Sequence, residues 1–387
     1  MAMRTEKCPI CQSECPAFLQ IHFNVKMSLP TEVRIRHCEQ DNFLFADGGE
    51  QFSYDEYYKS LANDSYHSEM ANGELHSPMS RLQQENLVGL LGIFFDQRRK
   101  VLDFGCGEAR LLLGLASKFS SSDFWGFDPS PGAQAGARTA QKIGLRNVTI
   151  SDLSPGNGPY DLILASHVLE HLIDFDMLRS WNALLDGKGF MYIEVPNALQ
   201  YAVCGRTEFL YYFDRLHVNH FTPHSLAQLV ARYGFSYVSH IEYGFPYRDA
   251  KPYPALGMLF RKGGRAVEIA SRSVFQAGML YLSQEKERAK LLNGQLKMHE
   301  GVLVWGAGDN FYRSIENEGP LSNLPQIVVL DSRPQVVTVG AKTWNTEIPS
   351  EGIRRYPWPV VITVSERRSA IGQQVRDIDP SRQIYFL

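Results

Sequence analysis

The sequence lacks the long apolar run that a membrane-spanning helix requires. No apolar stretch among its 387 residues approaches the roughly 20 that cross a bilayer. It also lacks any block of like charge, since 39 basic and 42 acidic residues give a net charge of -3. Nucleic-acid-binding proteins usually carry a basic stripe, so a nucleic-acid partner is disfavoured. The first residues lack the apolar core of a secretory signal, and we expect a cytoplasmic protein without a membrane span.

Cysteine is scarce, but its distribution is uneven. Three of the six cysteines are crowded near the start of the chain. Such crowding is more typical of metal ligands in a reducing compartment than of a disulfide framework. Residues 8–11 (CPIC) have the C-x-x-C spacing that lets two thiolates meet one tetrahedral zinc ion. Residues 38–41 stand where the second pair of a zinc ribbon is expected, with Asp41 in place of a thiolate.

This segment predicts a structural zinc site in a zinc-ribbon-like module. The predicted ligands are Cys8, Cys11, Cys38 and Asp41. Cys15 and His37 are alternative fourth ligands, and a donor weaker than thiolate should lower the affinity. The other interpretation is a ribbon that has lost its metal and folds around a small core. That core would consist of Ile10, Phe18, Ile35, Phe43 and Phe45.

A glycine-rich turn is the most informative motif of the chain. Residues 101–107 (VLDFGCG) predict a strand and a turn, and the apolar stretch 111–116 predicts a helix after it. Such a turn lets a nucleotide-like ligand approach the backbone, and the helix N-terminus offers unpaired N–H groups. Residues 124–128 predict a second short strand that ends in Asp128. This carboxylate lies about 20 residues past the glycines, where a ribose hydroxyl would be held.

The spacing D-x-G-x-G at Asp103, Gly105 and Gly107 differs from the G-x-G-x-x-G of dinucleotide sites. It resembles the cofactor loop of class I S-adenosylmethionine (SAM) methyltransferases. Further segments follow in the order of that family, at residues 148–153, 160–171 and 190–197. The second is a buried strand that runs into HVLEH, and the third predicts a strand ending in a proline-marked loop.

The resemblance implies cofactor contacts from the turn and from the strand ends, with Asp152 meeting the adenine amino group. The predicted cofactor-binding residues are Asp103, Phe104, Gly105, Gly107, Asp128, Pro129, Asp152, Leu153, Ser166 and His167. In methyltransferases of this architecture, the segment before the glycine turn folds over the cofactor. Tyr58 and Tyr66 of that segment are therefore added, and core packing is the alternative for both.

Residues 211–223 contain two histidines ahead of a predicted helix, which Thr222 should cap and Gly234 should end. His217 and His220 are therefore expected on a loop at the mouth of a crevice, where an imidazole suits proton transfer. The alternative for His217 is that it only braces the loop by hydrogen bonds. The predicted catalytic residues are His217, His220 and Asp214.

The remaining segments predict a hairpin, a connector and a second α/β unit. Residues 238–243 and 255–260 alternate like two antiparallel strands, and the loop between them is a candidate substrate wall. Residues 266–300 predict a long connecting helix, with apolar residues such as Val267 and Ala270 at helical spacing.

The C-terminal segment repeats the strand and glycine-turn pattern at residues 302–308, followed by a strand and an acid at 326–331. Residues 360–364 and 384–387 predict further buried strands. We interpret this unit as a small Rossmann-like domain whose turn serves packing or holds the nucleotide portion of a substrate. A second catalytic cofactor is the less favoured interpretation.

The order of these parts resembles the bacterial sugar C-methyltransferases of deoxysugar pathways. The implied fold class is α/β: a Rossmann-like class I methyltransferase core, an N-terminal zinc-ribbon-like module and a second C-terminal α/β Rossmann-like domain. The predicted domains are the module at 1–50, the core at 51–265, a helical connector at 266–300 and the C-terminal domain at 301–387.

In that family, a base removes a proton beside a keto group of a nucleotide-linked sugar, and the enolate attacks the SAM methyl group. The family's Tyr-x-Glu-His cluster corresponds here to Asp214, Leu216 and His217. The histidine is kept, but the tyrosine and the glutamate are not. C-methyl and O-methyl transfer therefore both stay open, with His217 as the base in either case.

The prediction is SAM-dependent methyl transfer to a sugar or related small molecule carried on a nucleotide, as in sugar biosynthesis. SAM and a structural zinc ion are the predicted cofactors, and a nucleotide sugar is the predicted partner. The alternatives are another small metabolite, a lipid-linked glycan, or a non-catalytic scaffold with this fold. The glycines and the acids Asp103, Asp128 and Asp152 argue against a scaffold, which has no need of all of them.

Overall fold

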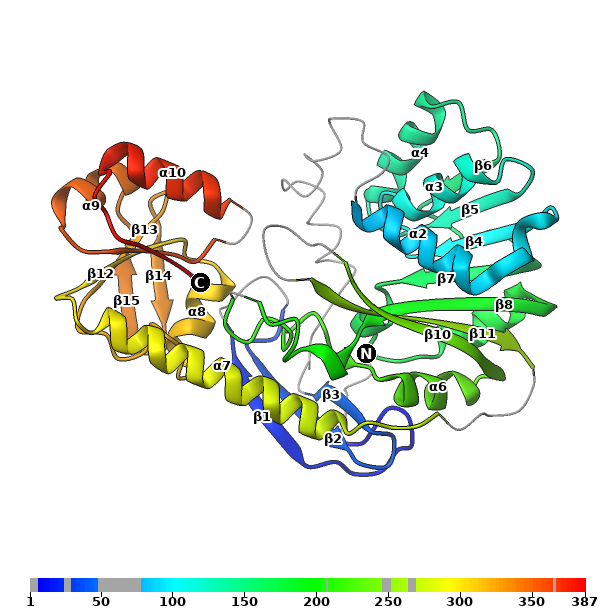
Figure 1. The fold of residues 1–387 in the computed structure, drawn as a ribbon, viewed down its shortest axis with the longest axis horizontal. Helices are drawn as coiled ribbons and strands as arrows, with labels where there is room; N and C mark the ends of the chain where they lie inside the picture. The colour runs from blue at the N-terminus through cyan, green and yellow to red at the C-terminus, as the bar shows by residue number, and fades with distance from the viewer. Residues whose placement is uncertain are drawn as a thin grey trace.

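The computed structural model describes residues 6–23, 29–47, 78–206, 208–245, 252–263, 269–364 and 367–387. Tyr58 and Tyr66, and the predicted boundary between residues 50 and 51, lie outside the described residues. Figure 1 shows a large core sheet and a smaller C-terminal sheet at opposite ends of the long axis. Helix α7 (Val274–Leu296) runs between them.

The core sheet has seven strands in the order β10-β11-β8-β7-β4-β5-β6. Their bounds are β4 (Lys100–Phe104), β5 (Asp123–Phe127), β6 (Val148–Ser151), β7 (Tyr160–Ser166), β8 (Leu185–Pro196), β10 (Phe235–Phe245) and β11 (Tyr253–Lys262). Strand β11 runs antiparallel to both of its neighbours, and the ladders from β8 to β6 are parallel. The hairpin predicted at 238–243 and 255–260 is confirmed as β10 and β11.

Helices cover both faces of this sheet, as its alternating apolar residues require. Their bounds are α2 (Pro78–Leu91), η3 (Gly92–Asp96), α3 (Arg110–Lys118), α4 (Gly132–Lys142), η4 (Leu169–His171), α5 (Met177–Leu184), η5 (Ala198–Gln200) and α6 (Pro223–Ala231). In β7, Leu162 and Leu164 belong to the core cluster that includes α2 and α3 residues, whereas Ile163 and Ala165 belong to the cluster of α5 and α6. Successive residues therefore serve opposite faces, as expected of a buried strand.

The order of the strands places a topological switch point between β4 and β7. From β4 the chain proceeds outward through β5 and β6, and then returns to the other side of β4 with β7. Open α/β sheets bind ligands at the carboxyl ends of the strands beside such a point. The glycine turn at 105–107 follows β4, and His167 follows β7. The fold therefore brings both predicted segments to the same sheet edge.

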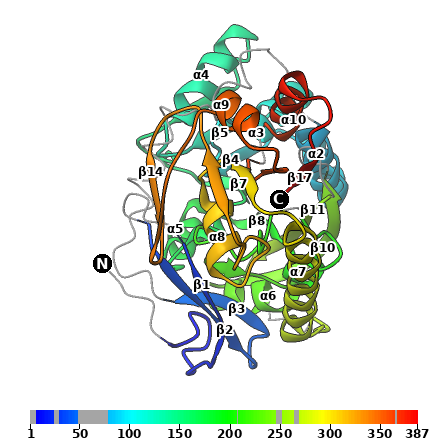
Figure 2. The same ribbon diagram turned by 90° about the vertical axis from the view of Figure 1, so that its left-hand side faces the viewer.

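The N-terminal residues form a second sheet that shares its core with the first. It has the order β1-β2-β3-β9, with β1 (Ala17–His22), β2 (Glu32–Cys38), β3 (Phe43–Asp47) and β9 (Asn219–His220). In Figures 1 and 2, β1 to β3 lie below the core sheet. Phe43 stacks against Phe45 and lies 5.1 Å from Phe221, centroid to centroid, within one cluster that extends into the core sheet. The segment does not fold around a small core of its own.

The predicted position of His220 on a loop is wrong, because this residue belongs to strand β9. Its backbone pairs with Leu44 of β3, and its side chain is fully buried. Tyr201 lies within hydrogen-bond distance, 3.1 Å from hydroxyl to Nδ1. The pairing of β9 with the N-terminal sheet removes His220 from any open surface. The following helix begins as predicted, with Thr222 and Ser225 forming a reciprocal cap.

The C-terminal unit is a parallel sheet with helices, as predicted. Its order is β13-β12-β16-β17, with β12 (Val302–Trp305), β13 (Ile327–Leu330), β16 (Val360–Ile362) and β17 (Ile384–Phe386). Its helices are α8 (Asp309–Glu316), α9 (Pro349–Arg355) and α10 (Arg368–Ile378), and a hairpin consists of β14 (Val336–Val339) and β15 (Lys342–Asn345). Figure 2 looks from this end of the molecule.

The connecting helix starts later than the predicted residue 266. Residues 269–273 are not helical, so the assignment of Ala270 to a helical face is wrong, and Val267 lies outside the described residues. The physical reason is Asn42, which sits in the turn after β2. Its Nδ2 donates to Ser271 Oγ and to the Arg272 carbonyl, both at 2.6 Å, and its Oδ1 accepts from Val274 N at 2.7 Å. These bonds hold residues 271–273 outside the helix, which begins at Val274 after the Ser273 cap.

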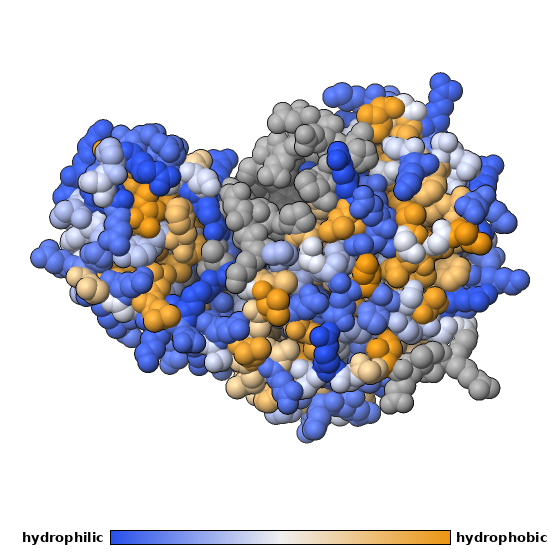
Figure 3. All heavy atoms as spheres, in the orientation of Figure 1, coloured by the Kyte–Doolittle hydropathy of each residue, from blue (hydrophilic) through white to orange (hydrophobic). Residues whose placement is uncertain are grey.

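The surface facing the viewer in Figure 3 mixes apolar and hydrophilic side chains. Helix α7 exposes some apolar side chains, among them Phe275, Met279, Leu280 and Leu291. Within the described part of the chain, no helix has the length and apolar character that crossing a membrane would take.

We predict that Asn42→Ala destabilises the protein because it removes the side-chain hydrogen bonds and places alanine in a strained backbone conformation. Asn42 has a φ of 49°, and alanine resists this conformation. The free energy of unfolding should fall by about 3 kcal/mol, of which roughly 1 kcal/mol is backbone strain. Asn323→Ala is the control, because Asn323 is exposed and has a φ of 54°. Urea denaturation should show a loss of about 1 kcal/mol for the control; equal losses would contradict a role of the Asn42 bonds.

Candidate functional site

The glycine turn after β4 has a packed side and an open side. Gly105 and Gly107 have φ values of 74° and 51°, which glycine adopts without strain. A Cβ on Gly105 would lie 2.5 Å from Val168 Cγ2, whereas a Cβ on Gly107 would meet nothing within 4 Å. Gly105 therefore allows close packing against the segment after β7. Gly107 leaves its backbone accessible to a ligand.

Asp128 connects the end of β5 to this turn. Its Oδ2 accepts a hydrogen bond from Gly107 N at 2.7 Å, and its Oδ1 accepts from Ser130 N at 2.8 Å. Each carboxylate oxygen has a second lone pair that can accept from a ligand hydroxyl. At the end of β6, Asp152 Oδ2 accepts from Gln134 Nε2 at 3.0 Å, and the neighbouring Leu153 is 88% exposed. The predicted strand-end acids thus follow adjacent parallel strands.

The other predicted cofactor residues lie around the same edge. Phe104 packs between Phe127 and Trp181, with centroid distances of 5.0 and 5.1 Å, and Pro129 is exposed after Asp128. Asp103 is buried near the end of β4. Burial raises the pKa of Asp103 to about 8, and the carboxylates of Asp128 and Glu194 add to the rise. A bound cation would favour ionisation of this carboxyl group.

Glu194 is a buried carboxylate in β8 that the sequence analysis did not single out. Four side chains donate hydrogen bonds to it: the hydroxyls of Ser166, Tyr192 and Tyr243 and the amide of Gln83. Burial by itself would raise the pKa of Glu194. The hydrogen bond and the charge of His167, with those donors, outweigh burial and lower this pKa to about 2. The available signal was a single acid within the apolar stretch 190–196 of β8.

His167 lies between two buried carboxylates. Its Nδ1 is 2.9 Å from Glu170 Oε1, and its Nε2 is 3.4 Å from Glu194 Oε1. Its φ of 55° is unusual for a residue with a side chain, and its backbone N–H donates to the Glu194 carbonyl at 2.8 Å. Burial lowers the pKa of His167, but Glu170 and Glu194 raise it further, to about 10. The histidine is therefore an imidazolium at neutral pH.

A second histidine pair adjoins Glu170. The rings of His171 and His217 are 4.9 Å apart, and one side-chain atom each from Glu170, His171 and His217 lie within 4.8 Å of one another. His171 Nδ1 donates to the Leu216 carbonyl at 3.0 Å. Burial and then the charge of His171 lower the pKa of His217 to about 4, although Glu170 and Asp214 oppose the shift. His217 is thus neutral near pH 7, which a general base must be.

The three predicted catalytic residues do not converge. Only His217 belongs to the Glu170 and His171 cluster among the described residues, since His220 is buried in β9. Asp214 Oδ1 accepts from Leu216 N at 2.7 Å, and its Oδ2 lies 3.8 Å from Arg313 Nη1 of α8. Asp214 therefore shapes the loop that carries His217. His171 is the last residue of the HVLEH motif, and the sequence analysis assigned it no role.

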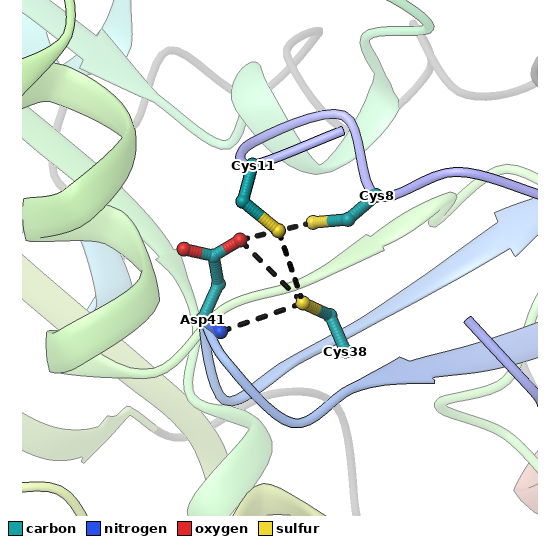
Figure 4. Close-up of side chains that lie close together, drawn as sticks. All are labelled: Cys8, Cys11, Cys38 and Asp41. Carbon is teal, nitrogen blue, oxygen red and sulfur yellow. Dashed lines mark hydrogen bonds between the residues drawn. The ribbon is translucent and has the colours of Figure 1, made fainter. Parts of the chain in front are cut away.

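The predicted metal ligands come together in the N-terminal sheet. Figure 4 shows Cys8, Cys11, Cys38 and Asp41 around one point, and one side-chain atom of each lies within 4.8 Å of the others. The Sγ atoms of Cys11 and Cys38 are 3.5 Å apart, and Cys8 Sγ is 3.2 Å from Asp41 Oδ2. The backbone N–H groups of Ile10 and Asp41 donate to the sulfurs of Cys8 and Cys38. Three sulfurs and one oxygen form a donor set that suits tetrahedral zinc.

The two alternative fourth ligands have other contacts. Cys15 Sγ donates to the Ser13 carbonyl at 3.4 Å, and the His37 ring packs against Phe275 at 4.9 Å. Neither belongs to the group of four. The geometry therefore favours Asp41 as the fourth donor.

The C-terminal glycine turn is packed against its own unit. Gly306 has a φ of 111°, and a Cβ there would lie 2.4 Å from Val364 Cγ2. Arg215, from the loop before β9, donates through Nη2 to Asp309 Oδ1 at 2.8 Å, at the start of α8. These contacts agree with the packing interpretation of this turn.

Comparisons with known proteins point to one enzyme class. Residues 76–240 match the model of a family described as a methyltransferase domain. A ubiquinone biosynthesis O-methyltransferase of Azorhizobium caulinodans is 32% identical over a 104-residue alignment, and the match covers 25% of this chain. The match spans 40% of that relative's length.

Two solved structures are similar to part of the chain. Magnesium protoporphyrin IX methyltransferase of Synechocystis, with bound SAM, is 14% identical, with a TM-score of 0.41, covering 55% of this chain and 99% of its own. The 1,6-didemethyltoxoflavin-N1-methyltransferase of Burkholderia thailandensis is 20% identical, with a TM-score of 0.40, covering 59% of this chain and 99% of its own.

We predict that the contribution of His167 to stability decreases as the pH rises. Its pKa is raised by folding, so the stabilisation is complete below the ordinary value near 6.5 and is lost as the pH approaches about 10. The difference in unfolding free energy between wild type and His167→Gln should fall by more than about 1 kcal/mol from pH 6 to pH 10. Urea denaturation at both pH values measures it. A constant difference would mean that His167 is not an imidazolium.

Proposed function

We propose that this protein transfers the methyl group of SAM to a small-molecule acceptor, because residues 76–240 match a methyltransferase-domain family and the core is an open α/β sheet with a switch point. The observation that carries the proposal is the sheet edge at the switch point. There, Gly107 leaves its backbone open and Asp128 is fixed beside it. The arrangement suits a nucleoside whose ribose hydroxyls bind the strand-end acid.

The described residues have the chemistry that SAM requires. Asp128 would hold the ribose hydroxyls, and Asp152 with the exposed Leu153 would hold the adenine. Asp103 and the neighbouring carboxylates favour a cationic ligand at this edge. When bound, SAM supplies an electrophilic methyl group on a sulfonium. The tasks left to the protein are alignment, deprotonation of the acceptor and exclusion of water.

His217 is our proposed general base. Its imidazole is neutral near pH 7, so it can take a proton from an acceptor hydroxyl or from a carbon beside a keto group. A hydroxyl acceptor is favoured by the similarity to the Azorhizobium relative, which is an O-methyltransferase. We infer that the acceptor is a sugar carried on a nucleotide, which rests on the resemblance to sugar methyltransferases. Incubation of the protein with labelled SAM and a panel of nucleotide sugars tests that inference.

We expect isothermal titration calorimetry to show micromolar binding of SAM. Asp128→Ala should weaken this binding by about 1.5–3 kcal/mol, because a charged hydrogen-bonding partner is lost. Asp186→Ala is the matched control. Asp186 also accepts from the backbone N–H two residues later, at 3.0 Å, but lies at the opposite, amino end of β8. Equal affinity of wild type and Asp128→Ala would refute the proposed placement of SAM.

We also propose that the N-terminal cluster binds one structural zinc ion. Elemental analysis of the purified protein should give about one zinc per chain, as the four donors predict. Cys38→Ser should remove the zinc, and Asp41→Cys should raise its affinity by supplying a fourth thiolate. Cys15→Ser is the control that keeps it. Loss of zinc from the control would show that Cys15, and not Asp41, is the fourth ligand.

A further inference from the structure

Glu170 is a buried carboxylate with one oxygen in use and one without a hydrogen bond. It is fully buried in η4, and His167 Nδ1 lies 2.9 Å from its Oε1. Its Oε2 is buried and has no hydrogen-bond partner within the described residues. Buried carboxylate oxygens are costly to leave unpaired, so a second partner for this oxygen is expected.

His217 has a buried ring nitrogen that could donate to this oxygen. Its Nδ1 is buried and also has no hydrogen-bond partner among the described residues. The neighbouring His171 uses its Nδ1 on the Leu216 carbonyl. The unpaired nitrogen and the unpaired oxygen therefore belong to the same small cluster of residues.

The two side chains are near each other, but these two atoms are not hydrogen-bonded in this structure. Resting on the proposed function, we propose that a small rotation of the two side chains lets Glu170 Oε2 accept a hydrogen bond from His217 Nδ1–H, which makes Glu170 the positioning residue of His217. This bond fixes the tautomer in which Nε2 carries the free lone pair. In the transfer step, the proton of the acceptor moves to Nε2, and the electron pair it leaves forms the new bond to the methyl group, while the bond from that methyl group to the sulfur breaks and its electron pair stays on the departing sulfur. Glu170 then stabilises the imidazolium, as a carboxylate does behind a histidine base.

The other charged groups that face His217 are committed elsewhere or have the wrong sign. They are His171 from η4, His167 after β7 and Asp214 on the same loop. Asp214 already accepts from Leu216 N and lies beside Arg313. The two histidines disfavour a positive charge on His217. Glu170 is therefore the carboxylate in this group that has an oxygen to offer.

Long-range ¹H–¹⁵N spectra of protein labelled in its histidines test the proposal without an acceptor. At pH 7.5 the wild type should show His217 as the Nδ1–H tautomer, with the signal assigned by its loss in His217→Gln. In Glu170→Gln, the His217 spectrum should shift toward the Nε2–H tautomer. Asp214→Asn, the matched control, should keep the wild-type tautomer. An Nε2–H tautomer in the wild type would overturn the proposal even if Glu170→Gln failed to fold.

Two further measurements separate this proposal from its competitors. If Mn²⁺ broadens the His171 and His217 signals together, the free oxygen of Glu170 serves a cation and the proposal fails. SAM calorimetry on the wild type tests the proposed function separately. Absence of SAM binding to the wild type would refute the proposed function but leave the tautomer result standing. An unchanged His217 spectrum in folded Glu170→Gln would refute the pairing alone.

Discussion

One imidazolium held between two buried carboxylates organises the site. His167 joins Glu170 of η4 to Glu194 of β8. It lies at the switch point between the adjacent strands β4 and β7, from which the chain connections lead to opposite sides of the sheet. Removing any one of these three residues would leave an uncompensated charge in the protein interior. The free-energy cost of that charge is much larger than the net stabilisation that the intact ion pairs provide. The unusual backbone of His167 is maintained because both carboxylates and the Glu194 carbonyl hold it in place. The glycine turn packs on the adjacent Val168, and the loop that carries His217 is bonded to His171 of the same segment.

The parts of the site that are local in sequence could be predicted from sequence. A glycine turn after one predicted strand and an acid at the end of the next strand depend only on nearby residues. Gly107 and Asp128 therefore lie where the sequence predicted them. The hairpin β10 and β11 and the cap at Thr222 also follow from short-range patterns. The metal-site residues came together because two short loops each carry their own spacing.

The parts that depend on distant pairing could not be predicted. Nothing near Glu194 in sequence shows that His167 will neutralise it, and nothing near His220 shows that β3 will recruit it into a sheet. The start of α7 is set by Asn42, which lies more than two hundred residues earlier in the chain. Its hydrogen bonds prevent the helix from beginning as early as the apolar spacing in the sequence predicted. In each case, a long-range contact outweighed a correct local preference.

The ion pairs of the loop that carries His217 have a mechanical consequence. This loop is attached to the C-terminal unit through Arg215 with Asp309, and through Asp214 with Arg313. Glu285 of α7 also accepts a hydrogen bond from Leu210 N at 2.8 Å. The loop and the residue just before it are thus held by contacts to α8 of the C-terminal unit and to the connecting helix α7. The position of the loop that carries His217 therefore depends on how the C-terminal unit is seated against the core.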